Sequence, residues 1–327
     1  MATNGSATRP TTTDSVYSIA LKIGETIIKG AGIKTHYSDF DKSPMEFGGI
    51  LEKLRVKVKA PTTFSPTNTT DATAYDTIVK RYFGTWAPQR YDTEIAPSYA
   101  KSVVTGEIQL AEFVAKLVNN LTESEALHAE ETYADLFFKN AANANGLIGI
   151  ASDGTVSGYL AGTTTLYEKM TATATYTPSK AEIFTAIRNR VKDMTFANTT
   201  YNGVDVGKNC TPMEDIRIVA PFKFLNDADV TFLSNLFNLE KADMLAKIVE
   251  VNGQEYSYTD TDSHVHTGFC IFVLSKNAVG RVVRGHEMRT MFVKERFTEW
   301  YGIHEEEMFY YDPTEKAWAI IADQSYT

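Results

Sequence analysis

A stretch that alternates apolar and basic residues constrains the fold of this chain most strongly. In its clearest part, residues 54–59 read Leu-Arg-Val-Lys-Val-Lys, and the stretch ends at Ala60 and Pro61. Side chains alternate between the two faces of a β-strand, so the apolar residues share one face and the basic residues share the other. The flanking sequence is too poor in apolar residues to bury this strand by itself.

A second extended segment follows a threonine-rich linker at residues 62–77. It contains the apolar and aromatic residues Ile78, Tyr82, Phe83, Trp86 and Tyr91. A two-stranded ribbon is at best marginally stable alone in water, so a long one persists only against other protein. We therefore predict that residues 50–100 form an arm that acts on a neighbouring subunit. The alternative is an ordinary edge hairpin that folds onto its own domain.

The composition is that of a folded chain with a substantial core. Hydrophobic residues make up 43% and aromatic residues 12% of the 327 positions, and the length allows about two domains. The polar N-terminus has no apolar signal-peptide stretch, and no apolar run is long enough to cross a bilayer, so we expect neither export by that route nor a membrane span. Only Cys210 and Cys270 are present. This predicts a reducing compartment without a disulfide framework, and both cysteines as small core residues.

The charge balance argues against strong nucleic-acid affinity. The formal net charge is −9 at pH 7, whereas binding to phosphate backbones depends on concentrated Lys and Arg. The acidic run Glu305, Glu306 and Glu307 is predicted to be a solvated strand end or turn, as charge runs usually are.

Two helices are indicated in the middle of the chain. Leu110, Val114, Leu117 and Leu121 repeat at helical spacing, which predicts a long helix over residues 106–145. A capping box at residues 122–125 (Thr-Glu-Ser-Glu) predicts that a second helix starts, or the first bends, at that point. A Thr-Pro pair at residues 177–178 predicts the start of another helix, which extends to residue 194.

The two ends of the chain differ in character. Residues 1–15 are polar and are expected to be disordered until they bind something, and residues 16–28 form a short amphipathic segment. The last third is predicted to be mixed α/β. Strands are expected at residues 216–220, 248–251, 269–274, 288–295, 307–311 and 317–321, with a helix at 226–237 and a turn at 312–315.

The strongest enzymatic candidate is the polar segment at residues 260–266, which brings together Asp260, Asp262, His264 and His266. Carboxylate and imidazole groups at this density can bind a divalent metal ion. No general base can be identified elsewhere, so the segment is predicted to be a solvated loop without catalytic function. His286 and His304 likewise have no nucleophile at a recognisable spacing.

The order of elements resembles that of the major capsid proteins of tailed bacteriophages, which have the Hong Kong 97-type fold. A polar arm precedes a β-ribbon, a long helix, an Asn-Gly-Leu-Ile-Gly exit at residues 145–149, a capped helix and a closing aromatic β-meander from Trp300 to Trp318. The resemblance implies an α+β fold with four parts. These are an N-terminal arm (1–47), an extended loop (48–104), a spine helix with a peripheral domain (105–210 with 286–327) and an axial domain (211–285).

The function implied by this resemblance is structural. The chain is expected to self-assemble through pentamers and hexamers into an icosahedral shell around double-stranded DNA, which it binds without sequence specificity. The resemblance also implies that scaffolding and portal functions belong to separate proteins. It implies assembly in the host bacterial cytoplasm and a final place in the virion. No catalytic residue, cofactor or metal is expected. The alternatives are an encapsulin-like compartment for protein cargo and, from another class, a metal-dependent enzyme that uses the loop between Asp260 and His266.

Charged residues of the ribbon and of the long helix are candidates for contacts between subunits. Basic side chains of one copy are expected to face acidic side chains of the next, although each exposed pair contributes at most about 1 kcal/mol. The alternative is that these charges only keep an edge strand soluble. The candidate residues are Arg55, Lys57, Lys59, Arg81, Arg90, Glu130 and Glu131.

Overall fold

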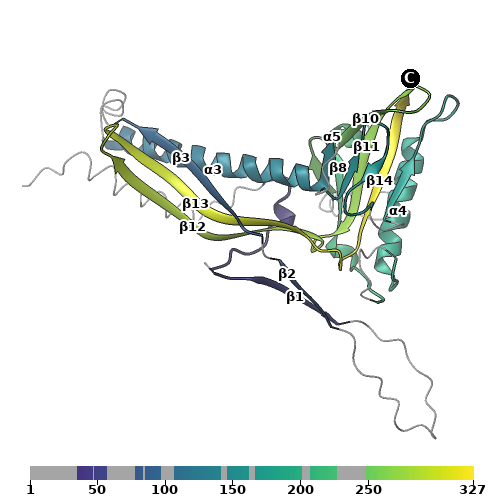
Figure 1. The fold of residues 1–327 in the computed structure, drawn as a ribbon, viewed down its shortest axis with the longest axis horizontal. Coiled ribbons are helices and arrows are strands. Elements are labelled where there is room, and N and C mark those ends of the chain that lie inside the picture. Colours follow the sequence, from purple (N-terminus) through teal and green to yellow (C-terminus); the bar gives the residue numbers. More distant parts are fainter. Residues whose placement is uncertain are drawn as a thin grey trace, which may run out of the picture.

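The computed structural model describes residues 35–46, 48–56, 78–83, 85–96, 107–140, 146–161, 166–200, 207–226 and 248–327. The molecule has an elongated part, in which a long helix runs beside a narrow sheet, and a mixed α/β part at one end of it (Figure 1). In the described residues, no helix is long and apolar enough to span a bilayer. The predicted amphipathic segment at residues 16–28 lies outside the described residues.

The elongated part is built on an antiparallel three-stranded sheet. Its strands are β12 (Val279–Val293), β13 (Thr298–Tyr311) and β3 (Ala87–Ile95), with β13 in the centre. The sheet runs beside helix α3 (Glu107–Phe137), as Figure 1 shows. Tyr301 and Ile303 of β13 pack with Leu121 of α3 and with Tyr91 of β3. The second extended segment of the sequence thus contributes β3 to this sheet and is not confined to the ribbon.

Helix α3 is continuous, so the prediction that a second helix starts at residue 122 is wrong. The Thr122 hydroxyl donates to the Asn119 carbonyl over 2.8 Å, and the Ser124 hydroxyl donates to the Asn120 carbonyl over 2.9 Å. Side chains that bond back to the preceding turn in this way are compatible with a helix interior. The helix ends at Phe137, before the predicted residue 145, because the chain continues into the short strand β4 (Phe138–Asn140).

The mixed α/β part contains the main core. Its sheet has the order β7 (Tyr167–Met170), β14 (Ala317–Tyr326), β11 (Val265–Ser275), β8 (Ile216–Pro221) and β9 (Ile248–Val251), and β10 (Glu255–Thr259) also pairs with β11. The β7–β14 and β8–β9 pairs are parallel, and the others are antiparallel. Central strands with continuous apolar runs are buried on both faces, as β11 is from Cys270 to Leu274.

Smaller elements complete this part of the molecule. A second small sheet joins β4, β5 (Ile148–Ile150) and β6 (Val156–Ser157), and 3₁₀ turns lie at Ser38–Phe40 and Met213–Asp215. Helix α4 (Lys180–Thr195) starts at a capping box between Ser179 and Glu182. The predicted start at Thr177 is therefore two to three residues too early. Helix α5 covers Phe222–Asn226; residues 227–237, which were expected to be helical, lie outside the described residues.

The ribbon, defined here as strands β1 (Leu51–Val56) and β2 (Ile78–Phe83), is antiparallel, as the sequence predicted. It projects below the elongated sheet in Figure 1. In β1 the basic side chain of Arg55 faces the body of the molecule, whereas the apolar side chain of Leu54 faces away from it and is 59% exposed. This is the reverse of the usual arrangement, in which apolar side chains face the core. Among the side chains of β1 that the structure describes, only Leu51 packs against a buried apolar cluster, formed by Val282 and Met308.

Candidate assembly surfaces and polar clusters

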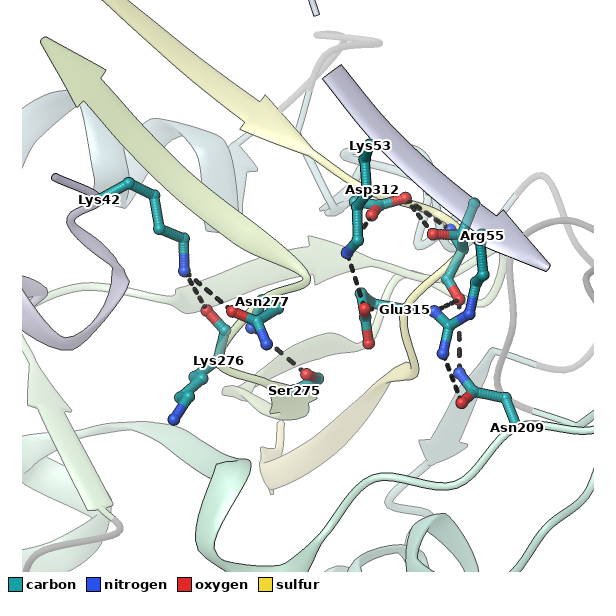
Figure 2. Close-up of polar contacts among 10 residues, drawn as sticks. Lys42, Lys53, Arg55, Asn209, Ser275, Lys276, Asn277, Asp312 and Glu315 are labelled. Atoms are coloured by element: carbon teal, nitrogen blue, oxygen red, sulfur yellow. Dashed lines mark hydrogen bonds and ion pairs between the residues drawn. The ribbon is translucent and has the colours of Figure 1, made fainter. Parts of the chain in front are cut away.

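The ribbon is fixed to the body of its own chain by a set of polar contacts that we call the ribbon clasp. Lys53 and Arg55 of β1 reach the turn between β13 and β14, where they meet Asp312, Thr314 and Glu315 (Figure 2). The Lys53 ammonium lies 2.5 Å from Asp312 Oδ2 and 2.7 Å from Glu315 Oε1. Two cations of the ribbon therefore face two carboxylates of one turn.

Neutral groups complete the clasp around Arg55. Its Nη1 donates to the Thr314 carbonyl over 2.7 Å, and its Nη2 donates to Asn209 Oδ1 over 2.5 Å. The turn itself is held by Asp312, whose Oδ1 accepts from the backbone amide and the hydroxyl of Thr314. Asp312 has no exposed surface. Burial of an ionised carboxylate lowers the stability of the fold unless a cation pairs with it. Lys53 supplies that cation for Asp312.

A third basic residue, Lys42, lies in the same region with different partners. Lys42 Nζ donates to the Lys276 carbonyl over 3.1 Å and to Asn277 Oδ1 over 3.2 Å (Figure 2). The segment that carries it forms bridges to β12 at Asp41 and Met45. The segment that precedes the ribbon is thus hydrogen-bonded along β12, and these contacts fix the position of the chain just before β1.

Several large apolar side chains are exposed at the extremities of the fold. Ile50, next to β1, and Leu54 of β1 are more than half exposed. Met291, near the end of β12, and Phe297, in the turn between β12 and β13, are also more than half exposed. The ribbon and this turn lie on parts that project away from the α/β core (Figure 1). Apolar side chains that gather on projecting elements are typical of surfaces that contact another protein.

The structure places the predicted interface residues as follows. Arg55 belongs to the ribbon clasp, and Arg81 lies in β2 opposite Lys53. Arg90 is exposed on β3, where its Nη2 lies 3.2 Å from an Asp92 carboxylate oxygen. On α3, Glu130 Oε1 lies 2.9 Å from His36 Nδ1, and Glu131 is exposed. Lys57 and Lys59 lie outside the described residues. A role for these residues between subunits stays a prediction.

The acidic run at residues 305–307 is not a solvated turn, so that expectation is wrong. It lies inside β13, and Glu305 and Glu307 are 3% and 2% exposed. Both meet the guanidinium of Arg281, which is also buried, at 2.9 and 3.1 Å. Glu125 of α3 lies 3.2 Å from the same guanidinium. The alternate residues of the run point into the molecule because they share the face of β13 that α3 covers.

We call Glu125, Arg281, His286, Glu305 and Glu307 the buried ion cluster. Burial, together with the charge of Glu125, raises the pKa of Glu305 to about 7. Burial also opposes protonation of His286, but the hydrogen bond and the charge of Glu125 outweigh it, so the pKa of His286 is raised. The cluster links the middle of α3 to the hairpin of β12 and β13.

The segment at residues 260–266 is only partly the solvated loop that the sequence predicted. Asp262 is exposed, and the ligand atoms of Asp260, Asp262 and His264 lie within 4.8 Å of one another. His266, by contrast, is buried and stacks on Tyr258 with ring centroids 4.5 Å apart. Its Nδ1 lies 2.8 Å from an oxygen of the fully buried Asp323. His266 is therefore a structural side chain of the β10–β11 pair.

The remaining candidates behave in two ways. Cys270 is buried, as predicted, but Cys210 is exposed, so the prediction that it is a core residue is wrong. The ring of His304 lies 5.4 Å from the Trp300 ring, on the face of β13 opposite Glu305 and Glu307, and both rings are partly buried. His286 belongs to the buried ion cluster. Sequence reasoning missed Arg281, Asp312 and Glu315; the period-two spacing of Glu305 and Glu307 inside a strand was the available signal for the cluster.

Comparisons with known proteins agree with this architecture. A family model described as Phi29-like phage major capsid protein matches residues 2–321. The chain is similar to the capsid structure of Staphylococcus phage Andhra, with a TM-score of 0.61 and 10% identity over 86% of this chain and 82% of that chain. It is also similar to a chain in the structure of the head fibre and inner core protein of native bacteriophage P68, with a TM-score of 0.56 and 10% identity over 86% and 83%.

A third similar structure is the capsid of Ralstonia phage GP4, with a TM-score of 0.50 and 10% identity over 89% of this chain and 88% of that chain. At such identities the likeness shows the fold alone, which is the α+β fold of phage capsid proteins. A comparison with curated proteins finds no match.

Proposed function

The chain belongs to the Phi29-like phage major capsid protein family and is a component of the phage shell, and we propose that it builds this shell through its projecting ribbon. Shell proteins of this kind act by repeated contact between identical copies, so their function lies in surfaces rather than in a catalytic centre. The proposal concerns which surfaces these are.

The observation that carries the proposal is the orientation of β1. Its basic residues Lys53 and Arg55 are satisfied by the ribbon clasp, whereas Leu54 on the other face is largely exposed. The clasp fixes the base and the direction of the ribbon without covering Leu54. Leu54 is therefore available to a neighbouring copy, and its burial there would supply apolar free energy that a lone subunit lacks.

The Hong Kong 97-type arrangement fits the elements. In this arrangement α3 serves as the spine, residues 48–104 form the extended loop, and residues 105–210 with 286–327 form the peripheral domain. Residues 211–285 form the axial domain, which lies nearest the centre of each pentamer or hexamer, and residues 1–47 form the N-terminal arm. The position of β3 argues that its part of the loop segment is an anchor, since β3 pairs with β13 along its whole length.

The contents and partners of the shell follow from the same proposal. We infer double-stranded DNA as the cargo, held without sequence-specific contacts. The net charge of −9 does not favour tight binding of the chain to phosphates, so we expect the DNA to be enclosed rather than tightly bound. Scaffolding and portal functions are assigned to separate proteins, and assembly to the cytoplasm of a host bacterium. Membership in a structural family also implies a chain without enzymatic activity.

Electron microscopy of particles from cells that express the full-length chain, combined with nucleic-acid staining after nuclease treatment, tests this function. Closed icosahedral shells of pentamers and hexamers are expected, with nuclease-protected DNA when the other phage proteins are present. Shells that retain only protein would favour an encapsulin-like compartment. Small soluble oligomers, with no closed particles under any condition, would contradict the proposal.

A further inference from the structure

Three side chains of the buried ion cluster meet at one point between the elongated sheet and α3. They are Glu125 of α3, His286 of β12 and Glu305 of β13, and their ligand atoms all lie within 4.8 Å of one another. His286 Nε2 is 3.2 Å from Glu125 Oε2 and 3.6 Å from Glu305 Oε2. One imidazole nitrogen and two carboxylate oxygens therefore converge from three separate elements.

A β-bulge in β12 brings His286 to this point. Arg284 pairs with Glu306 and Glu287 pairs with His304, so Gly285 and His286 together stand opposite the single residue Glu305. Gly285 has a φ of 62°, the left-handed conformation that glycine adopts in bulges of this kind. The bulge is the place in β12 where the His286 imidazole meets Glu305.

The charges of the cluster do not balance among its own side chains. Three carboxylates, those of Glu125, Glu305 and Glu307, surround the single guanidinium of Arg281. His128 Nε2 also lies 2.6 Å from Glu307 Oε1, so the formal charge is −3 + 1 = −2 when His128 and His286 are both neutral. Glu305 and Glu307 are almost fully buried. An excess of buried negative charge is costly, and it is relieved by protons or by a bound cation. A divalent ion would neutralise it fully.

One carboxylate oxygen of the cluster is buried and has no hydrogen bond. Glu305 is 97% buried, since its exposure is 3%, and its Oε1 accepts from Arg281 Nη2. Its Oε2 has no hydrogen-bond partner among the described residues, and it points toward His286 Nε2. Buried carboxylate oxygens are nearly always satisfied. This oxygen is an independent indication of a ligand at the meeting point.

The spacing of the donor atoms suits a first-row transition metal. Ligands at about 2.1 Å from a tetrahedral ion lie roughly 3.4 Å from one another, and the two separations at His286 Nε2 are 3.2 and 3.6 Å. One imidazole with two carboxylates favours Zn²⁺, Mn²⁺ or Co²⁺ over Mg²⁺ and Ca²⁺, which prefer oxygen ligands alone. We propose that Glu125, His286 and Glu305 bind one divalent transition-metal ion, which cross-links α3 to the β12–β13 hairpin.

Metal titration of the full-length chain tests this proposal. The protein is stripped with a chelator and titrated with Zn²⁺ by calorimetry, and with Co²⁺ by visible absorption. One equivalent per chain is expected in the unmodified protein, together with a higher thermal midpoint in the presence of Zn²⁺ because binding to the folded state stabilises it. Both effects are expected to disappear in Glu305→Gln and in His286→Asn.

Two matched variants serve as controls. Glu306→Gln changes the adjacent glutamate, which pairs with Arg284, and His264→Asn removes the histidine of the other Asp and His group in the described part of the chain. Both are expected to keep one equivalent of Zn²⁺. Binding that survives Glu305→Gln and His286→Asn but is lost in His264→Asn would overturn the proposal, as would the absence of stoichiometric binding to the unmodified chain.

A second measurement covers the case in which the cluster variants do not fold. X-ray absorption at the zinc edge of the loaded, unmodified protein is expected to show imidazole scattering and only nitrogen and oxygen neighbours. A sulfur shell would place the ion at the exposed Cys210 instead and would contradict the assignment.

Discussion

The Arg55 guanidinium at the base of the ribbon donates a 2.7 Å hydrogen bond to the backbone carbonyl of Thr314 in the β13–β14 turn. The same turn presents Asp312 and Glu315 to Lys53. A segment that extends away from the core is thereby fixed in direction by residues more than 250 positions later in the sequence. The ribbon is a surface element held by a specific polar anchor, and this anchor can be tested separately from assembly.

Replacing Lys53 by Met is expected to destabilise the isolated subunit. The substitution leaves the carboxylate of Asp312, which has no exposed surface, without its cation. Loss of such a partner costs about 1.5–3 kcal/mol of the free energy of unfolding, which chemical denaturation measures. Lys42→Met is the matched control, because Lys42 contacts only neutral oxygens in Figure 2 and should cost about 1 kcal/mol. Equal losses in the two variants would argue against the clasp.

Replacing Leu54 by Asp is expected to leave the subunit folded and to impair assembly. The side chain is 59% exposed, and surface substitutions usually change the free energy of unfolding by less than about 0.5 kcal/mol. In the shell the new charge would be buried against a neighbour. Light scattering of assembly reactions should show a large loss for Leu54→Asp and little change for Glu52→Gln, an exposed position on the same face of β1. If Leu54→Asp assembles normally, this face of β1 does not contact a neighbouring subunit.

The reversal of Lys57 and Lys59 to Glu is expected to weaken assembly most at low salt. Repulsion from acidic residues of a neighbour, with Glu130 and Glu131 as the proposed partners, is least screened there. Arg55 is left unchanged in this variant because it belongs to the clasp. The measurement is the assembly rate as a function of NaCl concentration. A defect that does not depend on salt would show that these charges do not act through such repulsion.

The free energy of unfolding is expected to rise between pH 8 and pH 9.5. Burial lowers the pKa of Lys316 from its ordinary value of 10.5 to about 8, while its Nζ donates to the Phe196 carbonyl and to Asn198 Oδ1. The unfolded chain therefore binds more protons in this window, so stability increases with pH, by at most about 1.4 kcal/mol per pH unit. Urea unfolding measures the slope, and Lys316→Met should flatten it. A slope that the substitution leaves intact would assign the effect to another group.

The β10–β11 pair allows a test of whether the segment at residues 260–266 is structural. His264→Ala should be nearly neutral for stability and for assembly, because the side chain is 40% exposed. His266→Ala should lower the free energy of unfolding by about 1–3 kcal/mol, since it leaves the buried Asp323 short of a partner and removes the ring that stacks on Tyr258. Thermal scans of both variants give the comparison. Similar midpoints for the two would contradict the assignment.

Sequence patterns predicted the elements whose neighbours are close in the chain. The ribbon, the long helix and the turn at Asp312 follow from period-two alternation, helical spacing and turn residues. The position of β3 was not predictable, because pairing with β13 depends on a partner about 200 residues away, and an extended aromatic segment fits a ribbon and a sheet equally well. The apparent capping box at Thr122 failed because its residues bond backward inside a longer helix.

Polar residues were harder to place than apolar ones. A run of glutamates usually lies in solvent, and only the tertiary position of Arg281 shows that Glu305 and Glu307 are buried. The ribbon clasp could not be predicted from local sequence either, because Lys53 and Asp312 are separated by most of the chain. His266 is another case: its burial depends on Asp323, which no local pattern connects to it.

The most direct test of the central claim, that the ribbon joins subunits, is particle counting by electron microscopy after residues 51–83 are replaced by a short Gly-Ser linker, combined with Asp312→Asn so that no buried carboxylate loses its partner. Leu51 and Phe83 are paired across β1 and β2, so such a linker can bridge the base of the ribbon while β3 keeps its pairing with β13. The account predicts a soluble subunit that unfolds cooperatively and forms no closed shells, whereas the full-length chain forms them under the same conditions. Closed shells of normal size from the shortened chain would contradict it.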